Sequence, residues 1–370
     1  MSQAGVYSES KMAWWFARDQ KLPDAPKQVQ VIVSDLCNQD CNFCAYRMSG
    51  YTSNELFVGD SPLAASGHSN PVRFMDTERA LRLMDEIRAL GSLSVQFTGG
   101  GEPTVHPHHE MIFSKALANG LRCALVSNGI KWRPRLFELL PRFDWVRVSI
   151  DAGTAETYAK IRRVPAAQFA RAIGNIETLA KSIGKYPTAL GVGYVVTPDN
   201  WQELRLGAKV AKEAGAHSLR LSAMFSPDDE RPFIDIYDRV VNDIRHARDL
   251  YEDDTFVIYD NFGSRFHDLR QHSPDYRTCA YQYYTTYIGG DFKVYRCCVL
   301  AYNRRGLIKG GDISTRPFDE YWRSQDRVDD FGDFDARGCP RCQFNAKNRE
   351  LLYVAGNTEA DVTPRHMEWP

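Results

Sequence analysis

The feature that most constrains this chain is a short loop with three cysteines, Cys37, Cys41 and Cys44, which follows a strand-like run at 29–34. Their spacing is C-x-x-x-C-x-x-C, and spacers this short keep the three thiolates on one side of the loop. Iron–sulfur clusters are normally held by four Cys thiolates, so three of them can bind a 4Fe–4S cube and leave one iron open. The alternatives are a zinc knuckle or a chance group of thiols, but zinc sites use four ligands and no fourth lies nearby.

The composition is that of an ordinary globular protein, and 370 residues allow one large domain or two ordinary ones. No apolar run is long enough to predict a membrane span, and residues 1–10 lack the hydrophobic stretch of a secretory signal. We therefore expect a cytoplasmic protein, and its nine cysteines point to metal binding rather than to disulfides. The net charge of −1 gives no general attraction to nucleic acid or to anionic membranes.

After an N-terminal arm at 1–28, strand-like and helix-like runs alternate up to about residue 265. The stretch 77–90 has the apolar spacing of an amphipathic helix, with Asp76 or Thr77 as its cap and Gly91 at its end. The alternation predicts a barrel-like α/β domain over 29–265, although periodicity alone does not distinguish it from a doubly wound sheet. The six candidate strands are 29–34, 93–99, 123–128, 145–150, 189–196 and 218–225.

Polar residues follow several of these strands at their carboxyl ends, where barrels of this kind gather their chemistry. The second strand leads into Gly99, Gly100, Gly101 and Glu102, where glycines allow the backbone to approach a ligand and the carboxylate can take a cationic group. A hydroxyl, an amide and a carboxylate follow the next two strands, and helix capping is the alternative for each of them. These residues are Ser127, Asn128, Ser149 and Asp151.

The cysteine spacing, with Phe43 just before the third cysteine, and the glycine loop resemble the radical S-adenosylmethionine (SAM) superfamily. The resemblance implies a partial (β/α)6 TIM-like barrel with a 4Fe–4S cluster on Cys37, Cys41 and Cys44. It also implies that SAM chelates the open iron and is cleaved reductively to a 5′-deoxyadenosyl radical. By the same resemblance, the SAM contacts are Phe43, Tyr46, Gly100, Gly101, Glu102, Ser127, Asn128, Ser149, Asp151 and Arg163, with Arg162 as the alternative to Arg163.

A second group of cysteines lies beyond residue 265. The aromatic runs 281–288 and 292–295 flank a glycine turn and predict a β-hairpin, with a helix-like segment around 317–327 further on. A hairpin brings the residues at its two ends together, and a later C-x-x-C completes four thiolates, which fit a structural zinc site equally well. These cysteines are Cys279, Cys297 with Cys298 as its ambiguous neighbour, Cys339 and Cys342.

The order of these elements resembles the auxiliary domain of SPASM/twitch radical SAM enzymes. The resemblance implies a small α+β twitch-like domain over 266–370. It also implies a second, auxiliary 4Fe–4S cluster with Cys279, Cys297, Cys339 and Cys342 as its ligands.

Together these features predict hydrogen-atom abstraction from a small polar substrate, with oxidation or isomerisation as the outcome and flavodoxin or ferredoxin as electron donor. A nucleotide-like substrate is an alternative, and so is a peptide, although we find no separate leader-binding segment at either end. The remaining alternative is a zinc-stabilised binding protein without enzymatic activity.

Two further stretches carry candidate side chains. The long connection at 47–71 lacks periodicity, as lids and binding segments often do, with disorder as the alternative. Its possible substrate contacts are Tyr51, Asn54, Glu55 and Phe57. We expect His106, His108 and His109 to be surface residues rather than metal ligands.

Overall fold

The computed structural model describes residues 24–46, 74–184, 186–226, 228–340 and 342–354. The substrate contacts expected at Tyr51, Asn54, Glu55 and Phe57 and most of the N-terminal arm lie outside the described residues. Among the helices in these ranges, none is long and apolar enough to cross a bilayer.

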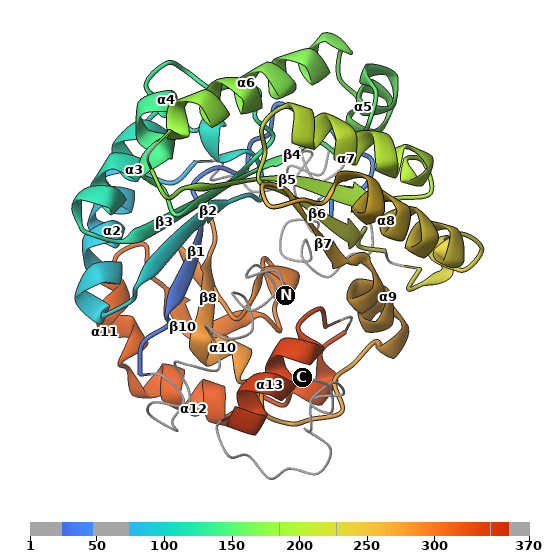
Figure 1. Cartoon of the computed structure of the whole chain (residues 1–370). Coiled ribbons are helices and arrows are strands. Elements are labelled where there is room, and N and C mark those ends of the chain that lie inside the picture. The colour runs from blue at the N-terminus through green and yellow to red at the C-terminus, as the bar shows by residue number, and fades with distance from the viewer. Residues whose placement is uncertain (1–23, 47–73, 185, 227, 341, 355–370) are drawn as a thin grey trace.

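Ten strands of the described chain form one sheet in the order β10-β9-β8-β1-β2-β3-β4-β5-β6-β7. Each of the first six strands pairs in parallel with the next one in sequence, so that β1 to β7 lie side by side in chain order. A doubly wound sheet reverses its strand order at a switch point, whereas this order is sequential. The barrel-like arrangement is therefore confirmed, and Figure 1 shows helices covering its outer side. The strands are β1 Gln28–Ile32, β2 Ser94–Thr98, β3 Arg122–Ser127, β4 Trp145–Ser149, β5 Ala189–Val196, β6 Ser218–Ala223, β7 Val257–Asn261, β8 Thr285–Ile288, β9 Lys293–Tyr295 and β10 Leu307–Asp312.

All six strands expected before residue 265 are present, and the structure adds a seventh, β7. Its sequence, VIYDN, has only three apolar residues, and Tyr259 and Asp260 are exposed at the edge of the sheet. Periodicity could not identify so short an edge strand, because one of its faces is not buried.

The helices alternate with the strands, and the principal core lies between the two layers. The helix predicted at 77–90 is confirmed: Asp76 accepts a hydrogen bond from the Arg79 amide at 2.9 Å, and Gly91 ends the helix with φ 97°. Only a residue without Cβ adopts that left-handed conformation at little cost. The helices are α2 Thr77–Leu90, α3 His109–Ala118, α4 Leu136–Leu139, α5 Ala155–Arg162, α6 Ala167–Ile183, α7 Leu204–Glu213, α8 Tyr237–Tyr251, α9 Phe262–Gln271, α10 Tyr281–Tyr284, α11 Phe318–Trp322, α12 Gln325–Asp333 and α13 Asn345–Val354.

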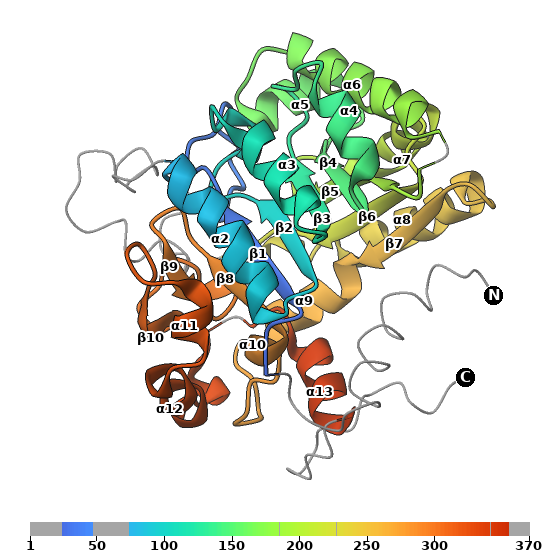
Figure 2. The ribbon, with the colours of Figure 1, turned by 90° about the vertical axis from the view of Figure 1, so that its left-hand side faces the viewer.

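The C-terminal region continues the same sheet, because β8 pairs in parallel with β1. Figure 2 shows β8 to β10 and α10 to α13 gathered at one side of the barrel. The expected hairpin is present, with Ile288 opposite Val294. The prediction is wrong for the first half of the run 281–288, because Tyr281–Tyr284 form helix α10. Tertiary contacts hold this turn, since Tyr281 stacks on Phe344 with ring centroids 4.1 Å apart. The segment expected around 317–327 consists of two helices, α11 and α12. The domain boundary at residue 265 stays a prediction.

Candidate active site: two groups of cysteines

The three-cysteine loop docks on the carboxyl end of helix α5. The amide of Asp40 donates to the carbonyl of Arg162 at 3.1 Å, and the amide of Asn42 donates to that of Ile161 at 2.9 Å. The last carbonyls of a helix have no partner within the helix, so the loop and the helix end satisfy each other. This docking holds Cys37, Cys41 and Cys44, all partly accessible, at the carboxyl ends of the strands.

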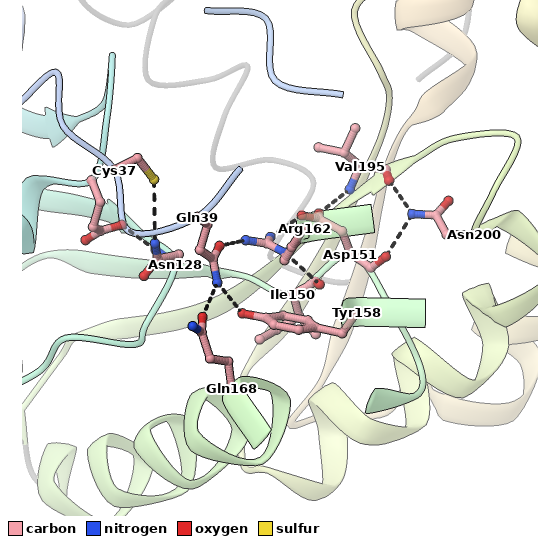
Figure 3. Close-up of polar contacts among 11 residues, drawn as sticks. Cys37, Gln39, Asn128, Ile150, Asp151, Tyr158, Arg162, Gln168, Val195 and Asn200 are labelled. Atoms are coloured by element: carbon pink, nitrogen blue, oxygen red, sulfur yellow. Dashed lines mark hydrogen bonds and ion pairs between the residues drawn. The ribbon is translucent and has the colours of Figure 1, made fainter. Parts of the chain in front are cut away.

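A buried network fixes the same loop from within (Figure 3). Arg162 donates to Gln39 inside the cysteine motif and forms an ion pair with Asp151, which follows β4. The other carboxylate oxygen of Asp151 accepts from the Val195 amide at 2.6 Å. Gln39 donates in turn to the Tyr158 hydroxyl at 2.7 Å. Arg162 and Asp151 are almost fully buried, so this pair is part of the support of the loop.

The glycine loop after β2 lies directly against the cysteine loop. The amide of Gly101 donates to the carbonyl of Ser34 at 2.9 Å, and the amide of Glu102 donates to the carbonyl of Leu36 at 2.8 Å. A Cβ at Gly100 would overlap the carboxylate of Asp35, and one at Gly101 would overlap the carbonyl of Leu36. Glycine is required here because two backbone segments approach too closely for a side chain.

Glu102 joins the ends of β2 and β3. Its carboxylate accepts hydrogen bonds from Thr104 Oγ1 at 2.7 Å, Ser127 Oγ at 2.8 Å and the Asn128 amide at 2.7 Å. Burial raises the pKa of Glu102, and these hydrogen bonds oppose the rise. Asn128 also donates to Asn38 in the cysteine loop at 2.7 Å. The Glu102 and Asn128 side chains therefore connect strand ends and cysteine loop to one another.

The remaining expected SAM contacts lie in different surroundings. Phe43 and Ser149 are half-buried near the mouth of the barrel, whereas the carboxylate of Asp151 is engaged by Arg162. Arg163 is exposed and pairs with Asp40 at 3.5 Å. The roles of these residues toward SAM stay predictions.

Tyrosines of the C-terminal region contact the cysteine and glycine loops, which sequence reasoning missed. The hydroxyls of Tyr46 and Tyr287 lie 2.6 Å apart, and Tyr287 donates to the carbonyl of Gly99 at 3.1 Å. Tyr302 donates to Asp35 at 2.6 Å. The dense run of tyrosines after residue 280 was the only signal in the sequence, and it does not reveal distant partners.

The second group of cysteines lines one cavity. Cys279, Cys297, Cys339 and Cys342 all face it, from three separate segments. Aromatic side chains close its walls, namely those of Tyr276, Tyr281, Phe334 and Phe344. Burial, together with the charge of Cys339, raises the pKa of the Cys279 thiol to about 11.

Two arginines beside this cavity keep unused donors. Nε of Arg296 and Nε of Arg305 are buried, and neither has a hydrogen-bond partner in the described chain. Arg296 lines the cavity, and Arg305 donates a side-chain hydrogen bond to Cys339. Unpaired buried donors are costly. An anionic group held by the four thiolates would satisfy them, so the residues present fit a thiolate-bound cluster.

Cys298, the ambiguous neighbour of Cys297, does not line this cavity. Burial raises the pKa of Cys298, while the cationic side chains of Arg265, Lys347 and Arg220 oppose the rise. Its thiol therefore has a different set of neighbours from that of Cys297.

The expectation of surface histidines is wrong for two of the three. His106 is 1% exposed and His109 is fully buried, while His108 is exposed. The ring of His106 pairs with the carbonyl of Met75 at 2.9 Å, and that of His109 with the carbonyl of His106 at 2.6 Å. In the described part of the chain, no three His, Cys, Asp or Glu side chains converge on a single ion position. A 4Fe–4S cluster does not require such convergence, because its ligands bind different irons.

An open parallel barrel with a three-cysteine loop and a glycine loop at its carboxyl end agrees with the radical SAM domain that the sequence resembles. The Radical SAM superfamily model matches residues 31–206, and the chain therefore carries a domain of this superfamily. Such domains bind a 4Fe–4S cluster and SAM, which are the cofactors predicted from the sequence.

Curated relatives match about half of the chain. It is 24% identical over 182 residues to the tungsten-containing aldehyde ferredoxin oxidoreductase cofactor-modifying protein of Pyrococcus furiosus, covering 48% of this chain and 51% of that one. It is 30% identical over 164 residues to the mycofactocin maturase MftC of Mycobacterium ulcerans, and the match covers 44% of this chain and 42% of that one. The match thus spans about half the length of these relatives or less.

Two solved structures share the fold over most of the chain. Streptococcus suis SuiB bound to precursor peptide SuiA superposes with a TM-score of 0.58 at 12% identity, covering 89% of this chain and 71% of that one. Native anSMEcpe with bound AdoMet superposes with a TM-score of 0.56 at 15% identity, covering 90% of this chain and 100% of that one.

Proposed function

We propose that this chain is a radical SAM enzyme that binds a 4Fe–4S cluster through Cys37, Cys41 and Cys44, cleaves SAM and abstracts a hydrogen atom from a carbon of a polar substrate. The observation that carries the proposal is the position of this loop, which lies against the glycine loop at the carboxyl ends of β1 to β4. When bound, the cluster and SAM supply the 5′-deoxyadenosyl radical, and the protein supplies binding, orientation and exclusion of competing reactions.

The protein groups around this site have separable tasks. Arg162, Gln39 and Asp151 orient the cysteine loop through buried contacts. Gly100 and Gly101 allow the backbone after β2 to lie close to the cofactors, and Phe43 and Ser149 remain accessible for contact with SAM. A side chain at either glycine would displace the loop, because it would overlap the neighbouring backbone or Asp35.

The cavity lined by Cys279, Cys297, Cys339 and Cys342 holds an auxiliary 4Fe–4S cluster in this proposal, within a twitch-like domain. The unpartnered Nε groups of Arg296 and Arg305 support a site for an anionic group there. With four protein ligands, such a cluster has no open iron for substrate and serves electron transfer. This role favours net oxidation, with isomerisation as the outcome if the substrate radical regains its hydrogen.

A peptide is the second candidate for the substrate. SuiB has been solved with a precursor peptide, anSMEcpe with the Cp18Cys peptide at a TM-score of 0.51, and MftC is named a maturase. No observation favours a nucleotide-like substrate in the same way. A cytoplasmic location and flavodoxin or ferredoxin as donor complete the proposal, since the cluster needs a reducing environment.

The test is anaerobic purification, reduction and addition of SAM, with 5′-deoxyadenosine measured by mass spectrometry. Pools of polyols and aminosugars, nucleotides, and peptides are added separately, and stimulation by one pool identifies the substrate class. Transfer of deuterium from substrate to 5′-deoxyadenosine would establish hydrogen abstraction. The absence of 5′-deoxyadenosine from protein with an intact cluster would overturn the proposal.

A further inference from the structure

Two arginines on the inner face of the barrel lie close together without a carboxylate of their own. Arg147 in β4 and Arg220 in β6 each lie between two aliphatic residues that are buried in the core. Alternate residues of a strand point to opposite faces, so both guanidinium groups lie on the inner face. Neither arginine forms an ion pair with a carboxylate in the described part of the chain.

The strand between them carries two glycines on the same face as the arginines. In the sheet, Arg147 lies opposite Gly191 of β5, and Arg220 lies opposite Gly193 of the same strand. A Cβ at Gly193 would lie 3.5 Å from Cδ of Arg147, which is ordinary contact. The two guanidinium groups therefore border a strip of backbone without side chains. We call this strip, with Arg147, Arg220, Gly191 and Gly193, the arginine niche.

No carboxylate in the described chain pairs directly with either arginine of the niche, although Cζ of Arg147 lies 5.3 Å from the centroid of the Trp145 ring. Burial lowers the pKa of Arg147 to about 9, and repulsion from Arg220 contributes. Burial also lowers the pKa of Arg220 to about 10, with repulsion from Arg265 contributing. Asp151 is the carboxylate that acts on Arg147, but it is already paired with Arg162.

Two further cations interact electrostatically with Arg220. In addition to burial, the positive charge of Arg265 in α9 lowers the pKa of Arg220, and the charge of Arg220 lowers the pKa of Lys347 in α13. Each has an acidic neighbour three residues further along its own helix, Asp268 and Glu350 respectively. The uncompensated charge is therefore concentrated at Arg147 and Arg220. Neighbouring charges of one sign raise the local concentration of the opposite charge.

We propose that the arginine niche binds an anionic group of the substrate, a carboxylate or a phosphate, and thereby selects the substrate by charge. This inference rests on the proposed function, because it places the substrate inside the barrel. Arg147 is the middle residue of β4, two residues before Ser149, one of the expected SAM contacts at the end of the strand. Planar guanidinium groups bind carboxylate and phosphate with two parallel hydrogen bonds, which fixes orientation as well as charge.

Direct binding tests the niche without relying on catalysis. Citrate and pyrophosphate are titrated by calorimetry into the intact protein and into three variants. Arg220→Gln removes one charge, and Gly193→Val fills the strip with a side chain that suits a β-strand. Arg245→Gln is the matched control, because Arg245 is exposed on α8 and forms no ion pair in the described chain.

The expected result is a dissociation constant at least about tenfold larger for Arg220→Gln and Gly193→Val than for the unchanged protein and Arg245→Gln. Circular dichroism verifies that each variant is folded. Equal binding by all four proteins would overturn the niche as an anion site, and so would no binding of either probe to the unchanged protein.

The source of the anion is distinguished with the SAM-cleavage assay. Peptides with Asp or Glu are compared with the same peptides carrying Asn or Gln, and phosphorylated metabolites with their dephosphorylated forms. Stimulation of 5′-deoxyadenosine by the acidic peptide alone indicates a carboxylate, and stimulation by the phosphorylated metabolite alone indicates a phosphate. Equal stimulation by charged and neutral partners would overturn selection by charge. Failure of all SAM cleavage would instead overturn the proposed function, and the calorimetry would still decide whether the niche binds anions.

Discussion

The two cysteine sites are built in opposite ways. The three thiols of the first come from eight consecutive residues, and the loop that carries them is held by α5, by the glycine loop and by Arg162. The four thiols of the second come from three separate segments that surround a cavity. Their charged neighbours differ as well, since Glu102 acts on Cys37 whereas Arg296 and Arg305 act on Cys339. A cluster with three protein ligands keeps one iron open for a cofactor, whereas a cluster with four protein ligands has no open iron.

Loss of one cysteine from the first site should have the largest effect. Cys41→Ala should reduce SAM cleavage to background, because a cluster with two protein ligands is not held in place. The measurement is 5′-deoxyadenosine formed per protein after anaerobic reconstitution. Cys123→Ala is the control, since Cys123 is buried in β3 away from both sites. Cleavage retained in Cys41→Ala would contradict the assignment of the first site.

Loss of one cysteine from the second site should spare the first. Cys342→Ala should lower the iron content by about half, because one of two 4Fe–4S clusters is lost. Iron and zinc are measured together by mass spectrometry. Unchanged iron with lost zinc would instead show that the four thiolates hold a structural zinc ion.

The support of the first loop should depend strongly on its buried ion pair. Arg162→Leu leaves the carboxylate of Asp151 buried without its partner, and breaking such a pair costs about 3–5 kcal/mol. Urea denaturation measures the free energy of unfolding. Arg163→Leu, next in sequence but exposed and 3.5 Å from Asp40, should cost about 0–1 kcal/mol. Similar losses in both variants would mean that the buried network does not hold the loop.

The arginines beside the second site should tune its potential. Arg296→Gln removes a buried positive charge from the wall of the cavity and leaves its ion-pair partner Asp330 negative. Both changes disfavour the added electron and make the reduction potential of that cluster more negative. A charge-assisted hydrogen bond of about 1.5 kcal/mol corresponds to about 60 mV for one electron. The reduction potential is measured by a redox titration in which electron paramagnetic resonance detects the reduced cluster. The first cluster is the internal control, and an equal shift in both clusters would contradict a local effect.

The smallest effect is expected where α5 begins. Glu203 accepts hydrogen bonds from the Gly153 amide at 2.9 Å and the hydroxyls of Thr154 and Thr157 at 2.8 and 2.6 Å. Desolvation alone would raise the pKa of Glu203, but these hydrogen bonds outweigh it and lower the pKa. The stabilisation is therefore present above the unfolded pKa, about 4.3, and is lost as the pH falls through the folded value.

Glu203→Gln should cost about 1 kcal/mol of unfolding free energy at pH 7, a value reduced by the exposure of the side chain. The difference from the unchanged protein should disappear toward pH 3. Glu213→Gln, in an exposed pair with Lys209, is the control. A constant difference between pH 7 and pH 3 would contradict a role for the ionised carboxylate.

Local features of the fold were predictable, and those that depend on distant contacts were not. Helix α2 was predicted to its exact ends because Asp76 and Gly91 act within one turn. Residues Tyr281–Tyr284 were expected in a strand, but stacking on Phe344 makes them helical. His106 and His109 were expected at the surface, but backbone carbonyls near them satisfy their rings inside the protein.

The sequence by itself determined the three-cysteine loop, the glycine loop and the positions of the first six strands along the chain, because each depends on residues that are neighbours in sequence. Only the tertiary structure decided that Cys297 rather than Cys298 lines the second cavity, and that Arg147 and Arg220 border a strip of glycine. Those facts depend on which face of a strand or turn a side chain occupies. That choice is made by packing between segments far apart in sequence, which spacing along the chain does not record.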